Sequence, residues 1–133
     1  MRFTALGGLG LGLALSLAGC DSPIETTAAT PYGGPPLDLT SSGPWHVIEA
    51  QAPSPGWKID FEHSRPGPDA QEVFITVRRP DPQFVYPQVI VDQLVSTDVR
   101  TSEPIEIYAR VVPHDQRGVG GTYHLVRTIE AAN

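Results

Sequence analysis

The chain has 133 residues, a formal net charge of -6 and a single cysteine. This length suits one domain, and a lone cysteine excludes an internal disulfide and a site built from several thiolates. The acidic excess argues against nucleic-acid binding, which needs clustered Lys and Arg, and against electrostatic adhesion to an anionic lipid surface. Fourteen prolines and thirteen glycines disfavour long helices beyond the first twenty residues, so the composition favours a β-protein.

Residues 1–19 have the layout of a secretory signal peptide, with Arg2 at the start and an uncharged, largely apolar stretch from residue 3 to residue 18. We expect this segment to be helical. Two further interpretations of this segment are open. It could be a plain signal peptide that is cut nearby, or an uncleaved helix, because the uncharged run approaches the roughly 18–20 residues that span a bilayer. Four glycines within residues 7–12 weaken the case for the helix.

The last residues of this segment, Leu17-Ala18-Gly19-Cys20, are an aliphatic residue, two small residues and a cysteine. This tetrapeptide resembles the lipobox of bacterial lipoproteins. The resemblance implies that the thiolate of Cys20 takes a diacylglyceryl group as a thioether and that a peptidase cuts between Gly19 and Cys20. It also implies a mature chain anchored to a membrane of the bacterial cell envelope. Asp21 resembles an inner-membrane retention signal and slightly favours the periplasmic face of the inner membrane.

Residues 20–44 are rich in Pro, Gly, Ser and Thr, which leaves little apolar surface to offset the entropy lost on ordering. We therefore predict a disordered tether over 20–44. From residue 45 apolar and polar residues alternate, as expected of half-buried strands. We predict a β-domain over 45–130 with strands near residues 45–50, 57–63, 71–79, 84–95, 104–112 and 122–129. About six short strands separated by turn residues indicate a small antiparallel β-sandwich or a partly open barrel.

The alternation also predicts which residues face the core. On the second strand it places Trp57, Ile59, Phe61 and His63 on one face. Val73, Ile75 and Val77 point inward on the third, opposite Phe74 and Thr76. The dense run Val89-Ile90-Val91 is typical of a strand buried on both faces. On the fifth strand Ile105, Ile107, Ala109 and Val111 point inward, whereas Glu106, Tyr108 and Arg110 point outward.

No catalytic motif, metal site or cofactor site is predicted. The four histidines, at 46, 63, 114 and 124, lack the close spacing of a ligand pair, although His63 and His124 could converge in a sandwich. His114 and Asp115 lie beside the glycines at 118, 120 and 121. A hydrolase would need a positioned nucleophile that is not evident there, so a turn joining the last two strands is the better interpretation.

Three features hint at binding. Arg78-Arg79 could clamp a carboxylate of a partner, although a solvated strand end neutralised by Asp81 is the simpler interpretation. Tyr108 and Phe74, which point outward, could form part of a binding face. The edge strands could also accept a strand from a partner.

A second resemblance covers residues 56–99. Gly56-Trp57, the strand ending in Pro80-Asp81-Pro82, and Tyr86-Pro87-Gln88-Val89-Ile90-Val91 look like the PrcB-like domain of small secreted or lipidated proteins found with surface proteases. That resemblance implies protein binding rather than catalysis.

These observations together predict a non-enzymatic envelope lipoprotein whose β-domain binds another envelope protein. The alternatives are a metal-dependent or enzymatic module that uses His114, Asp115, His124 or His63, and a carrier for a small ligand.

Overall fold

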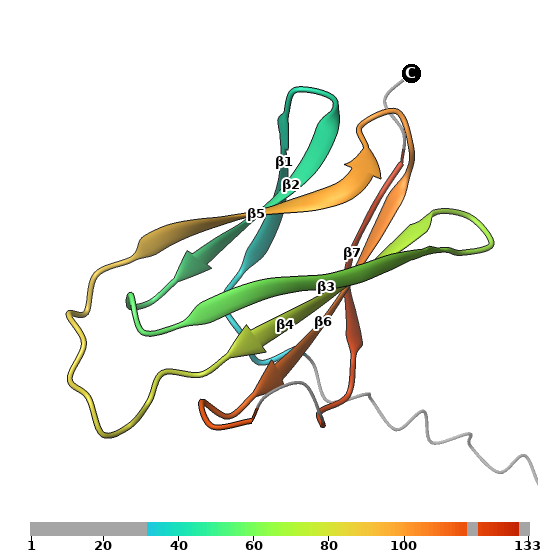
Figure 1. The fold of residues 1–133 in the computed structure, drawn as a ribbon. Helices are drawn as coiled ribbons and strands as arrows, with labels where there is room; N and C mark the ends of the chain where they lie inside the picture. The colour runs from blue at the N-terminus through green and yellow to red at the C-terminus, as the bar shows by residue number, and fades with distance from the viewer. Residues whose placement is uncertain (1–31, 117–119, 131–133) are drawn as a thin grey trace, which may run out of the picture.

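A computed structural model describes residues 32–116 and 120–130, and the strands in this part of the chain form two packed sheets (Figure 1). The strands are β1 (Leu37–Ser42), β2 (Trp45–Ala52), β3 (Lys58–Pro66), β4 (Gln71–Arg78), β5 (Val91–Arg100), β6 (Ile105–Val112) and β7 (His124–Ile129). The predicted all-β fold is therefore confirmed as a small β-sandwich. In the described ranges no helix is long and apolar enough to cross a membrane.

The strand order is β1-β2-β5 in one sheet and β3-β4-β6-β7 in the other. All neighbours are antiparallel except β4 and β6, which run parallel. The exception has a simple topological cause. The chain leaves β4, contributes β5 to the three-stranded sheet and returns as β6. It therefore re-enters the four-stranded sheet in the direction of β4. The predicted antiparallel pairing of the last two strands, β6 and β7, is confirmed.

The core lies between the sheets and follows the period-two pattern of the sequence. Val73, Ile75 and Val77 on β4 are fully buried, as predicted, and each pairs across the parallel ladder with a residue of β6. From the opposite sheet, Ile48 on β2 is equally buried in this core. Complete burial of each such side chain stabilises the fold by about 1.5–3 kcal/mol. Apolar packing therefore stabilises the domain.

The predicted tether over 20–44 was too long, because Leu37–Ser42 forms strand β1. Leu37 is 5 % exposed and belongs to the core, and Leu39 packs against that core from the same strand. The β1–β2 register joins Leu37 to Ala50 and Ser42 to Trp45, around a turn at Gly43 with φ 57°. Gly43 suits this left-handed conformation because it has no Cβ. The tether residues up to 31 and the expected signal helix lie outside the described residues.

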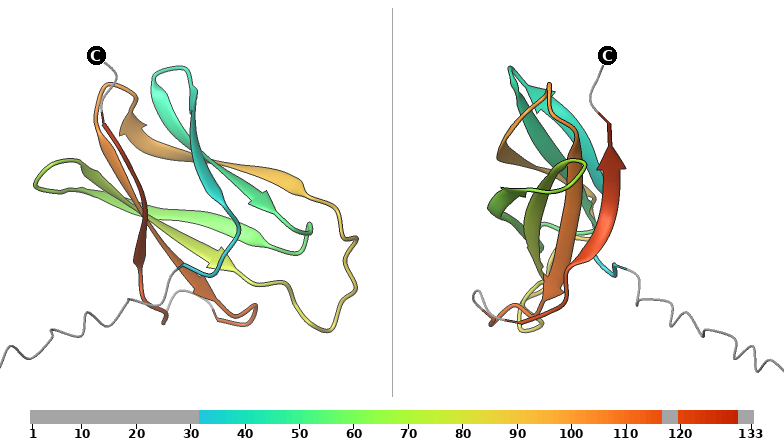
Figure 2. Two further views of the ribbon diagram at one scale, coloured as in Figure 1. Left: turned by 180° about the vertical axis from the view of Figure 1, so that it is seen from behind. Right: turned by 90° about the vertical axis from the view of Figure 1, so that its right-hand side faces the viewer.

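The expectation of a buried strand over Val89-Ile90-Val91 is wrong. Strand β5 begins only at Val91, and the side chains of Val89 and Ile90 are 54 % and 75 % exposed. The segment from residue 79 to residue 90 instead loops out between β4 and β5, beyond the ends of both strands (Figure 2). Its prolines at 80, 82 and 87 remove backbone donors, which keeps this apolar run out of a ladder.

A β-bulge in β3 changes the face on which one predicted inward residue lies. The β3–β4 register shifts between Phe61 and His63, so two residues of β3 replace one in the alternation. The ring of His63 consequently stacks on Phe74, with centroids 4.6 Å apart, on the outer face of the four-stranded sheet. Trp57, Ile59 and Phe61 pack in or against the core, as predicted, and His63 does not.

Polar contacts join the two sheets along both edges of the sandwich. On one edge Arg127 of β7 forms an ion pair with Asp38 of β1 at 2.8 Å. On the other, Ser64 of β3 donates a hydrogen bond to Asp98 of β5 at 2.5 Å. The second contact holds β3 beside β5, and the exposed segment 79–90 emerges at that edge.

Candidate functional site

The segment between β4 and β5 begins with a local turn. The backbone N–H of Gln83 donates to the carboxylate of Asp81 at 2.9 Å, and the N–H of Phe84 donates to the carbonyl of Asp81 at 3.2 Å. An Asp side chain that bonds to the backbone two residues later is typical of such turns. The turn directs the following residues away from β4.

Tyr86 holds the middle of the segment against the domain. Its ring lies over Gly56, close enough that a Cβ at position 56 would come within 2.8 Å of three ring atoms. The ring of Phe84 lies 6.5 Å from that of Tyr86 in a tilted arrangement. Tyr86 thus holds the middle of the segment, while Phe84 and Val85 beside it remain exposed.

The exposed side chains of this stretch form what we call the 84–94 surface: Phe84, Val85, Val89, Ile90 and Leu94. Phe84 is 64 % exposed and Val85 is 99 % exposed, and the other three are more than half exposed. Single exposed apolar residues are ordinary, whereas a group of them favours an interaction site. This is the strongest indication of a binding surface in the described part of the chain.

A pocket of about 290 Å³ lies beside this surface, and Phe84 and Tyr86 form part of its wall. We call it the basic pocket, because its other lining residues include three cationic side chains: Lys58, Arg78 and Arg79, with Gly56, Asp81 and His114. The whole chain has nine Lys and Arg residues, so a third of them line this one pocket.

The charges in the basic pocket are only partly compensated. Arg78 forms an ion pair with Asp60 at 3.7 Å, which is too long for a hydrogen bond, and its buried Nε meets no acceptor among the residues the structure describes. The guanidinium of Arg79 lies over the ring of Trp57, 5.8 Å from its centroid. Asp81, which we expected to neutralise the arginine pair, lies 3.7 Å from His114 instead.

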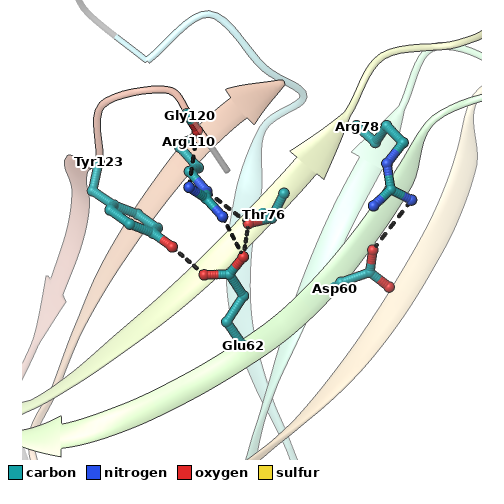
Figure 3. A network of polar contacts seen from close by, with 7 residues as sticks. All are labelled: Asp60, Glu62, Thr76, Arg78, Arg110, Gly120 and Tyr123. Carbon is teal, nitrogen blue, oxygen red and sulfur yellow. Dashed lines mark hydrogen bonds and ion pairs between the residues drawn. The ribbon is translucent and has the colours of Figure 1, made fainter. Parts of the chain in front are cut away.

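A separate polar network lies on the outer face of the four-stranded sheet (Figure 3). Glu62, the extra residue of the β3 bulge, accepts hydrogen bonds from Thr76 and Tyr123 and pairs with Arg110 at 2.6 Å. Arg110 also donates to Thr76 at 3.0 Å and to the carbonyl of Gly120 at 2.8 Å. Four segments of the chain therefore meet at Glu62.

The environment of Glu62 holds it in the charged form. Partial burial by itself would raise its pKa, but hydrogen bonds from Thr76, Tyr123 and Arg110, with the positive charge of Arg110, outweigh burial and lower the pKa below its ordinary value. Burial and the bond to Glu62 raise the pKa of Tyr123. The side chains of this network bond to one another, so the arrangement suits a structural role. It holds the β6–β7 connection against Arg110.

The four histidines do not converge. His63 and His124 lie on β3 and β7, at opposite edges of the four-stranded sheet. His46 is 7 % exposed and its ring lies 3.0 Å from the carbonyl of Glu103, and His114 lies at the basic pocket. Within residues 32–116 and 120–130 no group of three His, Cys, Asp or Glu residues could hold a metal ion.

Other predicted site residues have distinct outcomes. Cys20 and Gly19, the lipidation and cleavage residues, lie outside the described residues. Phe74 points outward as expected, but only 7 % of it is exposed, because aromatic rings and Arg65 cover it. Gly120 and Gly121 adopt positive φ of 112° and 84°, as the turn interpretation requires.

Sequence reasoning found Arg78 and Arg79 but missed Phe84, Val85 and Lys58. Phe84 and Val85 fell within the strand predicted over residues 84–95, and Lys58 fell within the strand predicted over residues 57–63, with no binding role for any of them. The prolines flanking Phe84 and Val85 were the available indication that this run stays outside the sheet.

Comparisons of this chain with protein-family models, with curated proteins and with solved structures found no match.

Proposed function

We propose that this protein is a non-catalytic lipoprotein of the bacterial cell envelope whose β-domain binds another envelope protein through the 84–94 surface. The observation that carries the proposal is the exposure of five large apolar side chains along one short stretch, which includes Phe84 and the 99 % exposed Val85. Burying such side chains against a partner is worth about 1.5–3 kcal/mol for each one fully covered. A few anchors of this kind supply most of the binding energy in ordinary interfaces.

The membrane anchor in this proposal rests on Cys20. Its lipobox-like setting supports thioether attachment of a diacylglyceryl group and cleavage after Gly19, and palmitate is a typical acyl chain for such an anchor. Two or more acyl chains hold a protein stably on a membrane, whereas one chain gives only marginal binding. Asp21 favours the inner membrane, with the β-domain in the periplasm.

A further contact in the structure supports protein binding. Gly56 and Tyr86, two of the residues behind the resemblance to the PrcB-like domain, touch each other directly. Their contact positions Phe84 and Val85 at the edge of the domain. The residues of that resemblance thus build the support for the exposed surface, which fits its implied role in binding a protein.

The lipid anchor is tested by metabolic labelling with an alkyne-tagged palmitate and by fractionation of membranes. Wild-type protein should carry the label and sediment with membranes, whereas Cys20→Ala should be unlabelled and either released or left unprocessed. A fully cleaved Cys20→Ala protein that stays in the membrane would sink the anchor assignment.

The partner is tested by affinity purification of the tagged lipoprotein from its own membranes in mild detergent. We expect one protein to co-purify with wild type and to be depleted from Val85→Ser. The matched control is Ser42→Ala, which alters an exposed residue in the β1–β2 hairpin, away from the 84–94 surface (Figure 1). Equal recovery from wild type and Val85→Ser would exclude the 84–94 surface as the binding site.

A further inference from the structure

The basic pocket lies directly beside the 84–94 surface, and the two share Phe84. We propose that the pocket receives a carboxylate side chain of the partner protein while neighbouring apolar side chains of the partner cover Phe84 and Val85. This inference rests on the proposed function and specifies the chemistry of the partner: a segment in which an acidic residue stands between apolar ones.

The charges of the pocket favour an anion. Lys58, Arg78 and Arg79 line it in a chain whose net charge is -6, so it is a local positive site on an acidic molecule. Such complementarity steers an acidic segment toward one place on the surface and fixes its register. Arginine suits this role because its planar fork can bond both oxygens of a carboxylate.

The existing contacts of the arginines leave them able to bind. The ion pair of Arg78 with Asp60 spans 3.7 Å, and the side chain of Asp60 is 58 % exposed, so that pairing is weak and can be exchanged. Stacking on Trp57 restrains the guanidinium of Arg79 without using its hydrogen-bond donors. Part of the entropy cost of ordering an arginine is thereby met before the ligand arrives.

The size of the pocket and its surroundings favour a protein segment over a lipid headgroup. A volume of about 290 Å³ lies just below the usual range for small-ligand sites and leaves room for a carboxylate side chain. Two carboxylates lie close by: Asp60 pairs with Arg78, and Asp81 itself lines the pocket. Their negative charges would repel an extended anionic surface. Binding to such a surface also needs larger clusters of Lys and Arg.

The test is isothermal titration calorimetry of the full, detergent-solubilised lipoprotein with defined probes. The first probe is the capped peptide acetyl-Leu-Glu-Phe-Glu-Leu-amide, and the second is its neutral analogue with Gln in place of both Glu residues. The third probe, glycerophosphoglycerol, is a lipid headgroup without acyl chains. We expect the Glu peptide to bind about tenfold or more tightly than the Gln peptide, because a charge pair is lost in the analogue.

Two variants with a matched control locate the binding. Arg79→Gln should weaken the Glu peptide about tenfold, and Arg78→Gln should have a similar effect. Arg100→Gln should change it less than about twofold, because Arg100 is exposed at the end of β5 and stacks on Trp45 instead of lining the pocket. The thermal midpoint of each variant shows whether it is folded, and Arg79→Gln preserves the Arg78–Asp60 pair.

Equal affinity for the two peptides, no binding of either, or an equal effect of Arg100→Gln and Arg79→Gln would overturn the proposal. Binding of glycerophosphoglycerol without binding of the Glu peptide would also overturn it, in favour of a lipid headgroup. These outcomes are distinct from failure of the proposed function. A partner that depends on Val85 could still be recovered when the peptides fail, and the 84–94 surface would then bind it without the basic pocket.

Discussion

Tyr86 packs its ring against Gly56 so closely that a Cβ at position 56 would lie 2.8 Å from three ring atoms. The contact joins the turn before β3 to the middle of the connection between β4 and β5. Tyr86 can hold this position only because residue 56 has no side chain. The placement of Phe84 and Val85, on which both proposals rely, therefore depends on Gly56.

Gly56→Ala should displace Tyr86 and loosen the segment 79–90. Overpacking of this kind costs about 1–3 kcal/mol, so we expect a lower thermal midpoint and faster proteolytic cleavage within 79–90. Gly33→Ala is the matched control, because no atom lies within 4 Å of a Cβ at position 33. Equal midpoints and cleavage rates for the two variants would show that Tyr86 does not depend on Gly56.

Glu62→Gln should destabilise the domain by about 2–3 kcal/mol in denaturant unfolding. The reason is that Arg110, whose side chain is 8 % exposed, would lose the negative charge that lies 2.6 Å from its guanidinium in a largely buried place. The control is Glu72→Gln. Its partner Arg65 is 61 % exposed, so losing this ion pair should cost less than about 1 kcal/mol of stability. A smaller effect of Glu62→Gln than of Glu72→Gln would contradict the structural role of the network.

The same carboxylate predicts a pH dependence. Because the pKa of Glu62 in the folded protein lies below its ordinary value of 4.5, its contribution to stability is fully present above that pH and is lost as the pH falls through the folded pKa. The stability difference between wild type and Glu62→Gln should therefore shrink as the pH is lowered below 4.5. Unfolding curves at successive acidic pH values measure it, and a constant difference would argue against a lowered pKa.

Val85→Ser should leave the free energy of unfolding within about 0.5 kcal/mol of wild type, because the side chain is 99 % exposed and loses no core contact. Val77→Ala, at a fully buried position of β4, should cost about 2–3 kcal/mol. Thermal unfolding of both variants checks the contrast. A marked destabilisation by Val85→Ser would mean that this residue supports the fold, and its value as a binding probe would be lost.

Local alternation was enough to predict the inward faces of β4 and β6. Apolar residues such as Val73 and Ile107 recur at every second position of these strands, and no bulge interrupts the pattern. It failed at β1, where Pro and Gly mask the Leu37–Leu39 alternation. It also failed at Val89 and Ile90, where hydrophobicity alone cannot distinguish a buried strand from an exposed segment.

The remaining features depend on contacts between distant residues. The partner of Glu62 is Arg110, 48 positions away, and their meeting depends on the bulge in β3 and on the parallel pairing of β4 with β6. Neither follows from local pattern. Arg78 and Arg79 were visible as a basic pair, but Lys58 and His114 join them only through the fold.

The central claim is that Val85 contacts a partner protein in the native membrane, and site-specific photo-crosslinking tests it most directly. A photoreactive residue replaces Val85 in the full-length lipoprotein. A second variant carries it in place of Ser42, which is also exposed. We predict one discrete crosslinked protein from position 85 that is absent from position 42 and is lost when Phe84→Ser is added. Crosslinks from both positions to the same proteins, or from position 85 to lipid alone, would contradict it.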